Sequence, residues 1–152
     1  MEFCFDFAER KLESAMLLGK YADSKSETAR SIAYDCHVSM EISMKALLEQ
    51  SGMSEKRIRK HSHNLMGLLD SIWSLKDSNG REIRSMGLWS VPVRDGVFDS
   101  VGLLLKEASK GSVYPNQMRY GNQVVSLEPL LLIEIASTVL KWCRLNSGRL
   151  SV

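Results

Sequence analysis

The stretch that decides the fold is residues 24–52, SKSETARSIAYDCHVSMEISMKALLEQSG. Its first four residues match the S-x-x-E capping box, in which a serine and a glutamate each satisfy an unpaired backbone N–H at a helix start. Apolar side chains then recur at three- and four-residue steps, which places them on one face of a helix. They are Ala29, Ile32, Ala33, Cys36, Met40, Met44, Leu47 and Leu48. The pattern predicts a helix over residues 25–51, about 40 Å long at 1.5 Å per residue, with Gly52 as its stop.

Helical spacing continues through the rest of the chain. We expect further helices at residues 64–75 and 98–108, one from near Asp6 to residues 19–21, and one from just after residue 126 to about residue 145. Asp6 and Glu9 are predicted to be the capping pair of the helix that begins near Asp6. Pro129 fits the first turn of the last, where its missing N–H is not needed.

The connecting segments complete the predicted architecture. Residues 53–63 form a polar, basic connection, residues 81–96 are ambiguous, and residues 111–125 look like a loop. The alternation with a period of two that strands require is nearly absent. Because a long helix in a small domain usually lies along a bundle, the sequence predicts one all-α domain over residues 1–152, with four or five helices packed up and down.

Composition limits the class of protein. The chain has 152 residues, of which 44% are hydrophobic and 25% charged. That is enough for a core without a disulfide or metal staple, and too apolar for a disordered tail. The 20 Lys and Arg against 18 Asp and Glu give a formal net charge of +2. This balance disfavours a globally basic nucleic-acid binder but permits a local basic patch.

Cysteine usage and the chain start indicate the compartment. The three cysteines are far apart and form no C-x-x-C pair, which fits a reduced cytosol better than a disulfide framework. The start, Met1-Glu2-Phe3-Cys4, lacks the basic residues and apolar run of a secretion signal. Residues 127–143 are the most apolar stretch, but they contain charges and are too short for a bilayer. We therefore expect a cytoplasmic protein without membrane attachment, and a buried core helix at residues 127–143.

Residues 56–64, KRIRKHSHN, carry the first candidate site. Four fixed cations lie within five residues, directly before a helix whose N–H groups and dipole favour an anion. His61 and His63 titrate near neutral pH and are able to donate or shuttle a proton. The run indicates a phosphate or other anion site. The alternative is a solvated linker in which Ser62 or Asn64 only caps the next helix.

Residues 114–122, YPNQMRYGN, carry the second candidate site. Arg119 suits a phosphate clamp and Tyr120 suits stacking on a base. Equally, Arg119 suits an ion pair that ties the loop to a carboxylate while the tyrosines cover one end of the core. Elsewhere, Glu41 and Lys45 have the spacing of an ion pair on a helix surface.

Residues 32–48, IAYDCHVSMEISMKALL, followed by His61-Ser62-His63-Asn64-Leu65, resemble the HEPN family. Those domains commonly show an acidic residue, then Lys-Ala-Leu-Leu, then His-x-His-[Asp/Asn]-Leu at the start of the next helix. A later Arg-Tyr followed by Pro or Gly also recurs in them, and Arg119-Tyr120-Gly121 resembles it. The resemblance implies a four- to five-helix up-and-down bundle, in agreement with the periodicity.

The resemblance also implies roles. HEPN proteins are commonly found beside minimal nucleotidyltransferases, in toxin–antitoxin and phage-defence systems, or as ribonucleases, and many dimerise. The ribonuclease members carry Arg, a polar residue, and a His four to six residues after the Arg, usually on a late helix. This chain has no histidine after His63, and its spacing match is Arg57 with His63, where Ile58 replaces the polar residue. In a ribonuclease, His63 would be the general acid or base and Arg57 would stabilise the phosphorane charge.

Three functions follow as hypotheses. The first is a non-catalytic module that binds nucleotide or RNA phosphate beside a partner enzyme of the nucleotidyltransferase type. The second is a protein-interaction or homodimerisation module, with Trp89 and residues 91–93 as an apolar contact patch. The third is a metal-independent endoribonuclease that uses Arg57 and His63. No cofactor or metal is expected, since the three histidines lack the pattern of a ligand set. The residues expected to bind phosphate are Lys56, Arg59, Lys60, His61, Asn64, Arg119 and Tyr120.

Overall fold

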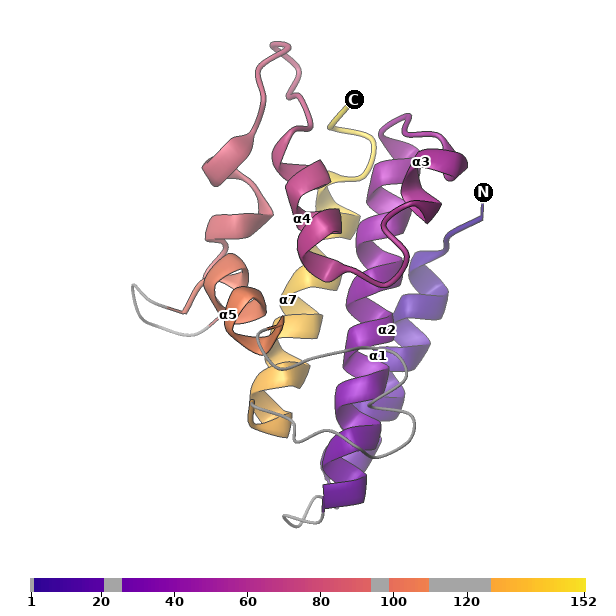
Figure 1. Ribbon diagram of the computed structural model, residues 1–152, viewed down its shortest axis with the longest axis vertical. Helices are drawn as coiled ribbons and strands as arrows, with labels where there is room; N and C mark the ends of the chain where they lie inside the picture. The colour runs from indigo at the N-terminus through magenta and orange to yellow at the C-terminus, as the bar shows by residue number, and fades with distance from the viewer. Residues whose placement is uncertain (1, 21–25, 94–98, 110–126) are drawn as a thin grey trace.

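The computed structural model describes residues 2–20, 26–93, 99–109 and 127–152 (Figure 1). Within these ranges the chain forms helices, two short 3-10 turns and isolated bridge pairs, and no strand, so the predicted all-α class is confirmed. The α-helices are α1 (Phe5–Gly19), α2 (Ser26–Gln50), α3 (Glu55–Arg59), α4 (Leu65–Trp73), α5 (Val101–Ser109) and α7 (Pro129–Asn146). The 3-10 turns are η1 (Arg84–Met86) and η2 (Leu88–Ser90).

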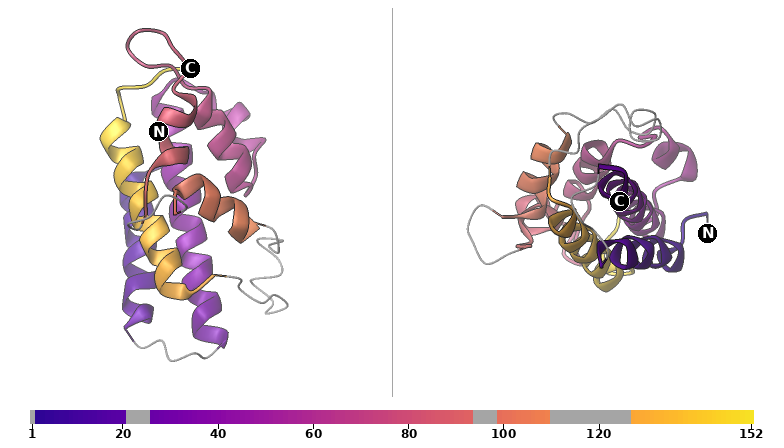
Figure 2. Two further views of the ribbon diagram at one scale, coloured as in Figure 1. Left: turned by 90° about the vertical axis from the view of Figure 1, so that its left-hand side faces the viewer. Right: turned by 90° about the horizontal axis from the view of Figure 1, so that it is seen from below.

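The three long helices α1, α2 and α7 lie side by side and form a bundle (Figures 1 and 2). α1 and α2 run in opposite directions, whereas α7 runs parallel to α2. The chain reaches the start of α7 through shorter elements, of which α4 and α5 pack against the long helices. The up-and-down order predicted from the sequence therefore holds for α1 and α2 but is wrong for α7.

The core is made by the apolar faces that the spacing predicts. On α2, all of the predicted residues from Ile32 to Leu48 are buried, which confirms the stripe. On α7, the buried face runs from Leu132 to Cys143, so this apolar stretch is a core helix as expected. Of the helices that the structure describes, none is both long enough and apolar enough to cross a membrane. All three cysteines are free thiols, with Cys4 exposed.

Helix ends follow sequence signals in several places. Gly52 follows α2 with a φ of +95°, a left-handed conformation that glycine adopts without steric cost. Pro129 occupies the first turn of α7. The capping box proposed at residue 24 lies outside the described residues.

The predicted capping pair of α1 is wrong. Asp6 and Glu9 do not cap α1, whose N-cap is Cys4 without a side-chain hydrogen bond. Both carboxylates instead lie at ion-pair distance from Arg144 of α7, at 2.9 and 3.1 Å. The connection at residues 53–63 contains the single turn α3, held by the buried side chain of Ile58.

Trp89 makes contacts within the chain. Its ring meets Trp73 edge-on, with 6.0 Å between the ring centroids, and it lies so close to Gly102 of α5 that a side chain at that position would overlap the ring. Val91 and Val93 are half-buried and pack against the core. At least part of this apolar region is therefore used for packing within the chain.

Candidate functional site

The turn at residues 60–64 links α3 to α4 and carries two of the three histidines. It is closed by backbone hydrogen bonds from the N–H of His61 to the carbonyl of Ile58 and from the N–H of Asn64 to the carbonyl of His61. Ser62 at its centre has a φ of 51°, which is left-handed. The two histidines of the turn contact different helices. His61 contacts Ser71 on α4, and His63 contacts Glu41 on α2.

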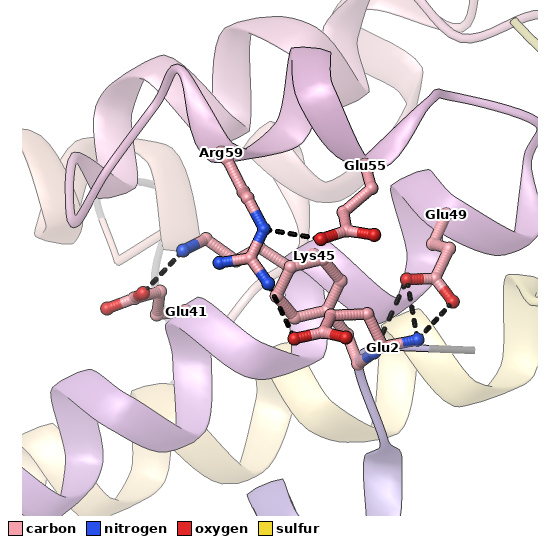
Figure 3. Close-up of polar contacts among 7 residues, drawn as sticks. Glu2, Glu41, Lys45, Glu49, Glu55 and Arg59 are labelled. Atoms are coloured by element: carbon pink, nitrogen blue, oxygen red, sulfur yellow. Dashed lines mark hydrogen bonds and ion pairs between the residues drawn. The ribbon is translucent and has the colours of Figure 1, made fainter.

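Glu41 and Lys45 form an ion pair in the interior, with 2.6 Å between Lys45 Nζ and Glu41 Oε1 (Figure 3). The two residues are only 5% and 6% exposed. The prediction of a helix-surface pair is therefore wrong, because residues distant in sequence cover this side of α2. A buried charge is costly unless it is paired, so each of these two groups depends on the other.

The imidazole of His63 is the second partner of Glu41. Its Nδ1 lies 3.1 and 3.2 Å from the two carboxylate oxygens, while the His63 side chain is 44% exposed. With Nδ1 protonated, the ring donates to the carboxylate, which fixes the ring orientation and the tautomer. Glu41 is thus a site residue that the sequence reasoning missed. The available signal was that Glu41 and Lys45 are the charged residues within the stretch from Val38 to Leu48, which is otherwise apolar or serine.

His37 on α2 holds the turn through a hydrogen bond to its backbone. Its Nε2 lies 3.1 Å from the backbone carbonyl of His63, so this nitrogen carries a proton and donates to that oxygen. Burial lowers the pKa of His37 to about 4, an effect that the His63 carbonyl and Glu41 oppose. His37 is therefore neutral at pH 7 and acts as a structural hydrogen-bond donor.

His61 is held against α4. Its Nε2 lies 2.8 Å from the hydroxyl of Ser71. Burial lowers the pKa of His61, and the positive charges of Lys45 and Arg57 lower it further, against the opposite effect of Asp70. His61 therefore adds hydrogen-bonding capacity to the corner, and its surroundings disfavour its charged form.

The four cations of residues 56–60 have different surroundings. Arg59 is paired, because its Nε lies 2.5 Å from Glu55 and its Nη2 lies 2.6 Å from Glu2 (Figure 3). The Arg59 pairs are exposed and hence individually weak.

Lys56, Arg57 and Lys60 are exposed, and no carboxylate among the described residues lies at ion-pair distance from any of them. We call residues 56–64 the basic corner. Lys56, Arg57 and Lys60 supply the positive charge of this corner that no described carboxylate neutralises.

Residues 2–4, the N-terminal segment, border this corner. The carboxylate of Glu49 near the end of α2 accepts the backbone N–H of Glu2 at 2.9 Å and that of Phe3 at 3.3 Å (Figure 3). The Phe3 ring centroid lies 5.5 Å from Lys45 Nζ, a cation–π distance. The segment is thereby connected to both Lys45 and Arg59.

Asn64, Arg119 and Tyr120 are the remaining predicted binding residues. Asn64 caps α4, since its Oδ1 accepts the N–H of Gly67 at 3.1 Å, so the capping alternative is confirmed for this residue. Arg119 and Tyr120 lie outside the described residues. Within the described ranges, no group of three or more His, Cys, Asp or Glu side chains is placed to hold a metal ion.

Comparison with known proteins gave no match: no protein-family model, no curated protein and no solved structure is significantly similar to this chain.

Proposed function

We propose that this chain binds the phosphate groups of nucleotides or RNA at its basic corner, as a HEPN-like, non-catalytic module beside a partner enzyme such as a minimal nucleotidyltransferase. The observation that carries the proposal is the contrast among four neighbouring cations. Arg59 is neutralised by Glu55 and Glu2, whereas Lys56, Arg57 and Lys60 are exposed without a described carboxylate partner. Such cations favour phosphate through charge-assisted hydrogen bonds and the release of counterions.

The support beneath the corner suits such a role. The turn is fixed on one side by His63 on Glu41 and on the other by His61 on Ser71. A rigid scaffold presents exposed cations at lower entropic cost than a free loop does. The buried side chain of Ile58 anchors the same helical turn that carries the three cations.

Binding of a fluorescent single-stranded RNA, with ATP as competitor, tests the proposal. The variant Lys56→Gln/Arg57→Gln/Lys60→Gln should bind more weakly than wild type. Its affinity should also depend less steeply on salt, by about 0.7 in the log–log slope for each phosphate that the variant no longer neutralises.

The matched control removes the same charge elsewhere. Lys20, Lys141 and Arg149 are exposed and have no described carboxylate partner either. Changing these three to Gln should leave the affinity and its salt dependence near the wild-type values. Equal behaviour of the two triple variants would contradict a site at the corner.

RNA cleavage is the second candidate function, and the contact between Glu41 and His63 favours it. A buried carboxylate that orients an imidazole is a common arrangement around a general base. Against it, Ile58 stands where the ribonuclease pattern has a polar residue, and its side chain is fully buried. Ile58 therefore has no access to RNA, which is why we rank binding above cleavage.

Cleavage is tested with labelled RNA in the presence of EDTA. If His63 is the general acid or base, His63→Ala should abolish metal-independent cleavage while binding at the corner persists. Cleavage by His63→Ala at the wild-type rate would remove that role.

A further inference from the structure

The N-terminal segment places an anion on the basic corner. The Glu2 carboxylate lies 2.6 Å from Arg59 Nη2, in the kind of charge-assisted contact that a phosphate oxygen makes with a guanidinium (Figure 3). The segment is fixed for this purpose by Glu49, which accepts the backbone N–H groups of Glu2 and Phe3. Two acidic residues from distant positions therefore cooperate to put one carboxylate on Arg59.

The same segment covers a second cation. The Phe3 ring lies over Lys45, a residue that is 6% exposed and pairs with Glu41. Because Glu41 also contacts His63, a continuous line of contacts runs from Phe3 through Lys45 to the turn of the basic corner. Departure of the segment would free the Arg59 guanidinium from Glu2 and remove the ring over Lys45.

We propose that the N-terminal segment is an internal competitor for the anion site: Glu2 holds Arg59 in place of a ligand phosphate, and a bound polyanion displaces it. This inference rests on the proposed function and adds its regulation. The affinity of the corner is then set partly by how firmly the segment is docked. After release, Arg59 keeps Glu55 on its Nε, and its Nη2 becomes available to a phosphate beside Lys56, Arg57 and Lys60.

The ion pair between Glu2 and Arg59 is weak enough for a phosphate to replace it. The side chains of Arg59 and Glu2 are 55% and 48% exposed, so water competes with their ion pair. Exposed pairs of this kind contribute little to stability. A nucleic acid brings several phosphates at once to four cations, which favours exchange of the single carboxylate.

The first experiment compares Glu2→Gln with Glu13→Gln by titration with the fluorescent single-stranded RNA. Glu13 is an exposed acid on α1, without a described ion-pair partner, so its variant has the same net charge. Glu2→Gln should tighten binding by about two- to fivefold, the range expected for one exposed pair, and Glu13→Gln should not. In an Arg59→Gln background the gain from Glu2→Gln should vanish.

Displacement itself is observed through Cys4, which belongs to the segment. Cys4 is exposed whereas Cys36 and Cys143 are buried, so a nitroxide maleimide labels Cys4 selectively. The spectrum of the labelled protein should show a more mobile spin label when RNA is added. Without RNA, the labelled Glu2→Gln variant should already be more mobile than the labelled wild type.

The outcomes separate this inference from the function on which it rests. If the triple variant of Lys56, Arg57 and Lys60 loses RNA binding but Glu2→Gln matches Glu13→Gln, the competitor is disproved and the anion site stands. A gain that persists with Arg59→Gln, or a label unaffected by bound RNA, also disproves it. If neither wild type nor Glu2→Gln binds RNA, both ideas fail.

Discussion

The Nδ1 of His63 lies 3.1 Å from the buried carboxylate of Glu41, although the two residues are 22 positions apart. The contact joins the long helix α2 to the turn before α4, and Lys45 pairs with the same carboxylate. One acidic group therefore neutralises a buried ammonium and orients a half-exposed imidazole. The stability of the fold and the geometry of the basic corner depend on the same residue.

Glu41→Gln should destabilise the protein by about 3–5 kcal/mol, because it leaves the ammonium of Lys45 buried without its counter-charge. Urea unfolding measures the loss. The double variant Glu41→Leu/Lys45→Met removes both charges and should be more stable than the single variant. A single variant as stable as wild type would show that water solvates Lys45 in solution.

Acid should destabilise the protein through His37. Its folded pKa of about 4 lies below its ordinary value of 6.5, since burial disfavours the charged form. The unfolded chain therefore binds more protons between these two values, and stability falls as the pH falls from 6.5 to 4. His61 acts in the same direction, because burial lowers its pKa too.

Urea unfolding at pH 7.5, 6.5 and 5.5 measures this effect in wild type and in His37→Gln. The glutamine keeps an N–H donor for the His63 carbonyl but does not titrate in this range. The variant should lose less stability than wild type between pH 7.5 and 5.5. Identical pH profiles for the two proteins would show that His37 is accessible to protons in the folded state.

The conformation of Ser62 predicts opposite effects for two substitutions. With a φ of 51°, the residue is left-handed, a conformation that costs an L-residue about 1–2 kcal/mol and glycine very little. Ser62→Gly should therefore leave the thermal midpoint unchanged or raise it, whereas the β-branched Ser62→Val should lower it. A destabilised glycine variant would indicate that the serine side chain makes a contact that outweighs the backbone cost.

The long helices could be predicted from sequence because their apolar spacing decides which face is buried. The stripe from Ile32 to Leu48 and the core face of α7 are confirmed for this reason. α3 could not be predicted in this way, since five residues with one buried side chain, Ile58, contain no period. The direction of α7 relative to α1 and α2 could not be predicted, because no local sequence pattern indicates it.

The site was harder to predict because its key contacts join distant residues. The spacing of Glu41 and Lys45 is the same on a surface as in an interior, and what buries them includes Phe3 and His63. Likewise, nothing local in Asp6 indicates that it pairs with Arg144, which is 138 positions away. Sequence patterns located the basic corner, but they did not show which of its cations were already paired.

Substitutions of Asn64 distinguish a role in helix capping from a role in ligand binding. Its Oδ1 accepts the N–H of Gly67, so Asn64→Ala should cost about 1 kcal/mol of stability, the usual value of an N-cap, in urea unfolding. Asn64→Asp keeps the capping oxygen and should keep the stability, but it places a negative charge beside the exposed cations. RNA affinity should therefore fall for Asn64→Asp and stay near wild type for folded Asn64→Ala. The reverse pattern would mean that the Asn64 amide touches the ligand and that the charge of the corner does not control binding.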